Sequence, residues 1–134
     1  MPRVKTQELL KLSWQGILAD YGTAIAWTPD GDRLAACSAA GEVVLYDAKT
    51  GTPSVLKPAQ GESIDALSIS PDGQFLAAAG QAGTVMIWQI GGASPQVLSE
   101  LTYPQVWIDR LQWHPHRPEL AFSVGRHVQV WDAL

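Results

Sequence analysis

The sequence lacks the residues on which several common kinds of site depend. Cys37 is the only cysteine among 134 residues, which excludes a disulfide within the chain and a CxxC pair of zinc ligands. Only 16% of the residues are charged and the formal net charge is −4, whereas 46% are hydrophobic. This composition fits neither a disordered tail nor a basic nucleic-acid-binding protein. We therefore expect one globular domain.

Signals for export and for membrane insertion are also missing. Charged residues interrupt the first part of the sequence, so it holds no uninterrupted apolar segment of a secretory signal. These residues are Arg3, Lys5, Glu8 and Lys11. No later run approaches the roughly 20 apolar residues that span a bilayer. Together with the lone cysteine, these features predict a cytoplasmic protein that contacts no membrane.

Motifs for catalysis and for metal binding are absent. The chain has no GxSxG, no P-loop and no GxGxxG, and its carboxylates form no recognisable acid/base pair. His114, His116 and His127 have no accompanying cluster of cysteines or carboxylates. No Lys or Arg lies between Lys57 and Arg110, which disfavours nucleic acid as a partner. We expect no enzymatic activity, no metal and no cofactor.

What the sequence does contain is one motif in three imperfect copies. The copies cover residues 24–31 (AIAWTPDG), 66–73 (ALSISPDG) and 110–117 (RLQWHPHR), and they align without a gap. Their prolines are 71 − 29 = 42 and 115 − 71 = 44 residues apart. A period in this range, with turn residues at fixed offsets, is typical of repeat proteins in which no unit buries its apolar face alone.

Each copy begins a series of short predicted strands. Alternating segments, separated by turns that contain Gly or Pro, indicate antiparallel neighbours and an all-β fold. The predicted strands are 23–28, 33–38, 42–47, 65–70, 74–80, 84–89 and 128–131, with outer strands at 53–56 and 96–101. Residues 34–37 (LAAC) and 76–79 (LAAA) are small or apolar at every position, which predicts sheets that are buried on both faces.

These features resemble the WD-repeat β-propeller family, whose repeats have an outer strand, three inner strands and a closing Trp-Asp pair. The turn Ser70-Pro71-Asp72-Gly73 matches the family pattern, and Trp131-Asp132 and Tyr46-Asp47 match the closing pair. The resemblance covers nearly the whole chain. It implies one domain over 1–134 with three blades of four antiparallel strands. The implied outer strand is at about 6–12, and the repeats are at about 20–51, 52–92 and 93–134.

Several polar positions depart from the family pattern. Many members have a Gly-His pair before the first inner strand and an Asp between the second and third, which form a network with Ser or Thr and Trp. Here the Gly-His positions are Ile17-Leu18, Ala59-Gln60 and Tyr103-Pro104, and the turns are Ala39-Ala40, Gln81-Ala82 and Val124-Gly125. We expect that network to be absent, so that packing and turn chemistry hold each blade together.

Three blades are few for a propeller, which typically has about 4 to 8. If the strand around Glu8–Leu12 pairs beside Val128–Asp132 of another copy, the contact is head-to-tail and must close into a ring or polymerise. Two chains give six blades and three give nine, and we favour two. The residues predicted at this seam are Leu9, Leu10, Leu12, Arg110, Gln112, Val128, Val130 and Trp131.

Two other arrangements remain open. In one, the chain is an amino-terminal piece of a longer propeller of about seven blades. In the other, a different protein supplies the missing blades. The sequence does not decide between them.

Aromatic and basic residues near the third copy are candidates for binding a partner. Trp107 lies at the entry to the first strand of that copy, and Trp, Tyr and Arg dominate interface hot spots. Tyr103, Arg126 and His127 complete the predicted partner site. The resemblance implies a non-catalytic interaction scaffold that binds itself and an unidentified protein or peptide. An enzyme with an unrecognised site is the alternative of another class.

Overall fold

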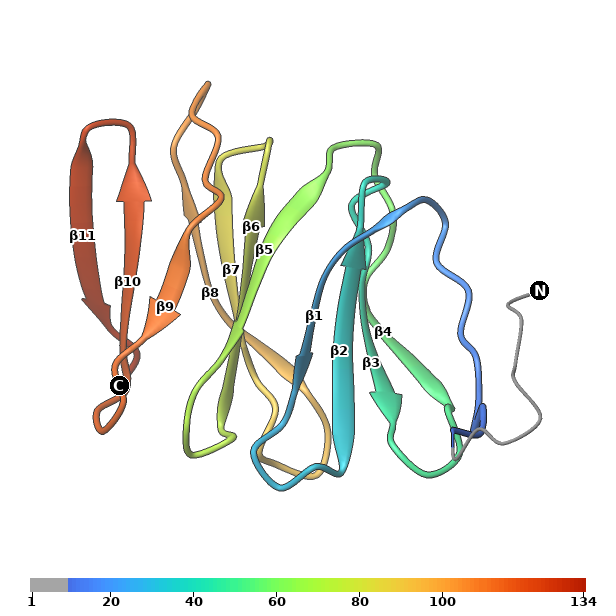
Figure 1. Ribbon diagram of the computed structural model, residues 1–134. Helices are drawn as coiled ribbons and strands as arrows, with labels where there is room; N and C mark the ends of the chain where they lie inside the picture. The colour runs from blue at the N-terminus through green and yellow to red at the C-terminus, as the bar shows by residue number, and fades with distance from the viewer. Residues whose placement is uncertain (1–9) are drawn as a thin grey trace.

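The structure, a computed structural model, describes residues 10–134. Over these residues the chain forms eleven strands in three antiparallel sheets and no helix (Figure 1). Sheet 1 contains β1 (Gly22–Trp27), β2 (Arg33–Ser38), β3 (Val43–Asp47) and β4 (Pro53–Lys57). Sheet 2 contains β5 (Ile64–Ile69), β6 (Phe75–Gly80), β7 (Thr84–Gln89) and β8 (Gln96–Thr102). Sheet 3 contains β9 (Leu111–Trp113), β10 (Glu119–Val124) and β11 (His127–Asp132).

The strands predicted from the repeats are confirmed. Those at 33–38 and 84–89 have the expected bounds, and the others differ by one residue at one end or at both ends. Sheet 3 has three strands among the described residues, where the family pattern implied four. The outer strand expected at about 6–12 is not seen in residues 10–12, which form no strand, and residues 6–9 lie outside the described part of the chain.

The three sheets stand side by side in chain order, and their cores lie between them (Figure 1). Successive residues of a strand point to opposite faces of its sheet. We call the face toward the earlier part of the chain the leading face, and the opposite one the trailing face. Within residues 10–134, sheet 2 alone is covered by a sheet on each face, and every residue of β6 is buried.

Each core joins a trailing face to the next leading face. The core between sheets 1 and 2 contains Ala35, Cys37, Val43, Leu45, Ile64, Leu76, Ala78, Trp88 and Ile90. The core between sheets 2 and 3 contains Phe75, Ala77, Ala79, Val85, Ile87, Ile108, Trp113, Leu120 and Phe122. Alanines on the central strands bring the sheets close together, and large side chains on neighbouring strands fill the remaining space. This arrangement explains the all-apolar strands of the sequence.

Hydrogen bonds between sheets fix how they sit on one another. The indole Nε1 of Trp113 on sheet 3 donates to the backbone oxygen of Ser68 on sheet 2 at 2.9 Å. The guanidinium of Arg33 on sheet 1 donates to the backbone oxygen of Ile90 at 2.8 Å. The ring of Trp113 also stacks on Phe75, with centroids 5.4 Å apart. Apolar burial therefore drives the stacking of the sheets, and these hydrogen bonds fix how neighbouring sheets are aligned.

Two of the three repeated turns share one hydrogen-bonding arrangement, and the third turn has a different one. The hydroxyl of Ser70 donates to the Asp72 carboxylate at 2.6 Å, and Gly73 takes a positive φ of 76°. The Thr28 to Asp30 hydrogen bond of 2.7 Å repeats this arrangement in sheet 1. The Ser70 hydrogen bond, and then the Gln74 backbone amide, lower the pKa of Asp72.

The third turn replaces the carboxylate with an imidazole. His116 occupies the sequence position of Asp72, as the alignment indicates. It is His114, however, whose Nδ1 accepts from the backbone amides of His116 at 2.9 Å and of Arg117 at 3.0 Å. His114 therefore has a structural part in this turn.

Acid should weaken the carboxylate turns. Because hydrogen bonding lowers the pKa of Asp72 below 3.8 in the folded chain, the carboxylate stabilises the fold above that pH, and the stabilisation is lost as the pH falls through the folded value. Asp72→Asn removes the titrating group, and Ser70→Ala removes the hydrogen bond that lowers its pKa most. Urea unfolding between about pH 5 and pH 2 should show a smaller pH dependence in both variants. A wild-type slope in both would contradict the assignment.

Candidate interaction surfaces

The predicted partner site lies on the loops at the upper end of the sheets in Figure 1. Tyr103 and Trp107 lie in the connection from β8 to β9, and Arg126 and His127 lie at the turn from β10 to β11. Trp107, Arg126 and His127 are exposed, whereas Tyr103 is half-buried. The structure thus gathers the four residues at one end of the molecule and on neighbouring elements.

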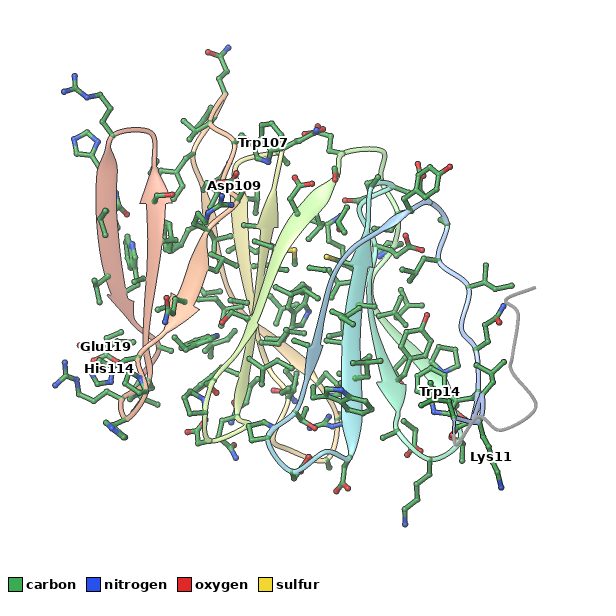
Figure 2. The ribbon with its side chains drawn as sticks, viewed as in Figure 1. Lys11, Trp14, Trp107, Asp109, His114 and Glu119 are labelled. Atoms are coloured by element: carbon green, nitrogen blue, oxygen red, sulfur yellow. The ribbon has the colours of Figure 1, made fainter. Side chains whose placement is uncertain are left out.

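Trp107 links sheet 2 to the loop that enters sheet 3. Its indole Nε1 donates to the Asp65 carboxylate at 2.8 Å, and the Ser63 hydroxyl donates to the other carboxylate oxygen at 2.6 Å. The Trp107 side chain remains 57% exposed, at the upper rim in Figure 2. Ser63, Asp65 and Trp107 are the same residue types as in the expected family network. They occupy other positions, however, and no histidine joins them. The indole ring is therefore held by a hydrogen bond and is also accessible to solvent.

Tyr103 holds sheet 3 in place and offers less to a partner. Its hydroxyl donates to Oε1 of Gln129 at 2.6 Å, and its ring meets the edge of Phe122 with centroids 5.9 Å apart. Trp131 donates to the same Gln129 oxygen at 2.8 Å. Tyr103 therefore connects the loop after β8 with β11.

The trailing face of sheet 3 is open and apolar. Val128 and Val130 on β11 are 78% and 61% exposed. Gln112 on β9 pairs with Ala121, which pairs with Val130, so these side chains share the face. A pocket of about 350 Å³ on this face is lined by Gln112, Trp113, His114, Pro115, Arg117, Glu119, Ala121 and Val130.

One other residue predicted at the seam, Trp131, lies on the opposite face of sheet 3. Trp131 pairs with the buried Leu120, which places it on the face toward sheet 2. Arg110 precedes β9 and makes an exposed ion pair with Asp109, with 3.4 Å between Nη1 and Oδ2. Such exposed pairs contribute about 0–1 kcal/mol. The seam prediction therefore depends more on the outer edge of β11 than on the side chains of Trp131 and Arg110.

The leading face of sheet 1 is covered in part by residues 10–21, which climb along it before entering β1 (Figure 1). Trp14 and Leu18 pack on a small core made of Ala36, Val44 and Tyr46. Trp14 lies 5.3 Å from Tyr46 between ring centroids, and its Nε1 donates to the Ala48 backbone oxygen at 2.9 Å. Gly16 and Gly51 leave room for these rings, because a Cβ at either would overlap Tyr46 or Trp14.

A buried carboxylate fastens the upper part of this segment. Glu42 accepts a hydrogen bond of 2.8 Å from the backbone amide of Ala19 and another from the Ser38 hydroxyl. By contrast, Leu10 and Leu12, predicted at the seam, are exposed, and Leu9 lies outside the described residues.

The inner part of the same face remains open. Ile25 and Trp27 on β1 are 70% and 57% exposed. Their equivalents in sheet 2, Leu67 and Ile69, pack against the core with sheet 1. In sheet 3 the equivalent of Trp27 is Trp113, which is buried against sheet 2. The same positions are therefore covered twice in this chain by a preceding sheet.

The sequence interpretation missed Ile25, Trp27, Trp14 and Leu18. The first two carry a readable signal, since the repeat alignment places them with apolar residues in both other copies. Trp14 and Leu18 precede the first copy of the motif. Their packing depends on the path of the chain there, which the repeat pattern does not predict.

No other kind of site stands out. In the part of the chain that is described, no cluster of three or more His, Cys, Asp or Glu side chains is arranged to hold a metal ion. No helix among residues 10–134 has the length and apolar character to cross a membrane.

Comparison with known proteins identifies the repeats. The family model "WD domain, G-beta repeat" matches residues 21–47 and 54–89, which contain β1 to β3 and β4 to β7. The chain therefore contains repeats of the WD-repeat family. No curated protein matches it in sequence.

Solved propellers share the fold. The RRP9 WD40 repeats match with a TM-score of 0.77 at 19% identity, and U3-55K with 0.77 at 18%. The Cps50 (Swd1) β-propeller domain of Myceliophteria thermophila matches with 0.73 at 22%. Each match covers 87% of this chain and 36% or 37% of the other. This chain thus spans little more than a third of the propellers that it resembles.

The Trp107 hydrogen bond should be measurable in a double-mutant cycle. Trp107→Phe keeps an aromatic ring and removes the donor, and Asp65→Ala removes the acceptor. We expect a coupling energy of about 1 kcal/mol from urea unfolding of the wild type, the two single variants and the double variant. Additive effects would show that the indole makes no stabilising contact with Asp65.

Proposed function

We propose that this protein is a non-catalytic interaction scaffold whose three sheets are blades of a larger β-propeller, and that further copies of the chain complete the ring. One observation carries the proposal. The two end faces of the stack have apolar residues at positions that are buried wherever the chain supplies a neighbouring sheet.

The trailing face of sheet 3 shows this most clearly. Val128 and Val130 correspond to Val85 and Ile87 in sheet 2, which are buried against sheet 3. The corresponding pair in sheet 1, Val43 and Leu45, is buried against sheet 2. Burying an aliphatic side chain of this kind contributes roughly 1.5–3 kcal/mol, so covering both ends favours association.

The two end faces suit each other. Every contact within the stack joins a trailing face to a leading face, and residues 10–134 leave one face of each kind open. A contact between copies that repeats this pairing is head-to-tail, and such contacts produce rings or filaments. Two chains give six blades, within the usual range of about 4 to 8, and three give nine. We therefore favour a dimer.

The docking function is proposed for the upper loops. Trp107 presents an aromatic ring that is already fixed by Asp65, and Arg126 and His127 add exposed donors beside it. A fixed aromatic loses little conformational entropy when a partner binds, which favours it as an anchor for a protein or peptide. Cys37, free and buried, supports a reducing, cytoplasmic setting.

A longer propeller chain is the second candidate. The solved propellers are nearly three times as long as the matched region, so this sequence fits equally well as one part of such a protein. In that case, blades from the same polypeptide cover both end faces. A different protein that supplies these blades would have the same effect on the two faces.

Light scattering behind a sizing column tests the closure. The wild-type chain should elute as a discrete multiple of 14.5 kDa, and Val128→Glu combined with Val130→Glu should return it to a single chain. Val97→Glu combined with Leu98→Glu is the matched control, because both residues are exposed on β8, the outer strand of sheet 2, and sheet 2 has neither end face. The control should keep the wild-type mass.

Two outcomes would contradict self-closure. One is a monomeric wild type at all concentrations, which would favour a longer chain or another protein as the source of the missing blades. The other is an assembly that both double variants leave unchanged, because the trailing face of sheet 3 would then lie outside the contact.

A further inference from the structure

Within residues 10–134, two stretches of backbone have no hydrogen-bonding partner among the described residues. β11 pairs with β10 along one edge, and no described strand pairs with its other edge. Residues 10–18 lie outside every strand and make no backbone–backbone hydrogen bond to any described residue. Sheets 1 and 2 each have an outer fourth strand, β4 or β8, at the position that is free beside β11.

Side chains hold residues 10–18 in an extended path. Trp14 and Leu18 anchor the segment on sheet 1, and Glu42 binds the amide of Ala19 just after it. The segment covers the outer part of the leading face and leaves Ile25 and Trp27 on the inner strand exposed. A preceding blade would place its outer strand over the covered part and its inner strands over the exposed part.

The sheet 1 to sheet 2 contact shows the same relation. Leu56 on the outer strand of sheet 1 packs on a core that includes Trp88 of sheet 2. Trp14 packs on Tyr46, which is the repeat equivalent of Trp88. Residues 10–18 therefore make, on sheet 1, a contact of the kind that the outer strand of a preceding blade makes.

Direction and charge also match the free edge of β11. The segment climbs from the lower to the upper end, whereas β11 descends, so the two would run antiparallel as β3 and β4 do (Figure 1). At the lower end, Lys11 would meet Asp132 (Figure 2). These two side chains have opposite charges.

We propose that residues 10–18 of one copy form the fourth strand of sheet 3 in a second copy. The proposal rests on the self-closure described above and specifies how the seam is made. Because Trp14 and Leu18 already hold the segment in an extended conformation, little conformational entropy is lost when the copies associate. This moves the seam strand from the predicted 6–12 to 10–18, which overlap at 10–12, and it adds backbone hydrogen bonds to the apolar contact between end faces.

Proline substitution tests the strand directly. Proline has no amide hydrogen, and alternate residues of an edge strand donate toward the neighbouring strand, so either Leu12→Pro or Ser13→Pro must remove a bond to β11. We expect one of the two variants to raise the dissociation constant by about tenfold and the other by less. Ser13→Ala keeps the amide and should stay within about twofold.

The monomer provides the control for folding. Residues 12 and 13 make no backbone hydrogen bond to any described residue, so urea unfolding of the proline variants at low concentration should match that of the wild type. Amide hydrogen exchange of residues 10–18 should slow when the wild type assembles and should stay fast in the dissociated variant.

The failures are distinguishable. A wild type that never assembles overturns both the self-closure and the shared strand. An assembly that survives both proline substitutions, with fast exchange in residues 10–18, overturns the shared strand and leaves the contact between end faces standing.

Discussion

Burial of both faces of each sheet is the constraint on which the rest of this structure depends. A sheet with apolar residues on one face needs one neighbour, whereas these sheets are apolar on both and need two. Sheet 2 meets this requirement within the chain, which explains why β6 consists of small and apolar residues throughout. Sheets 1 and 3 meet it on one side.

The two ends differ in how they are covered. On sheet 1 the segment before β1 lies across the outer part of the face, held by Trp14 and by the Glu42 carboxylate. On sheet 3 nothing described covers Val128 and Val130, and β11 has a free edge. The chain therefore has a segment without a sheet at one end and a sheet without a fourth strand at the other. This asymmetry favours head-to-tail completion.

Much of the fold could be predicted from the sequence because the repeats are read in register. Turn residues such as Pro71 and Gly73 fix where strands begin, and the alternation fixes which residues are buried. The surfaces were harder to predict. The sequence predicts Tyr103 and Trp107 in one partner site, whereas the Tyr103 hydroxyl donates to Gln129, because a contact made across a loop leaves no local pattern. The packing of Trp14 on Tyr46 depends on the path of the chain, which has no repeat.

The central claim is that the trailing face of sheet 3 meets the leading face of sheet 1 in another copy. An isotope-filtered nuclear Overhauser experiment on a mixture of labelled and unlabelled chains measures this contact directly. The account predicts cross-peaks between the methyl groups of Val130 in labelled copies and the indole protons of Trp27 in unlabelled copies. An assembly heavier than one chain that shows no such cross-peaks would contradict it.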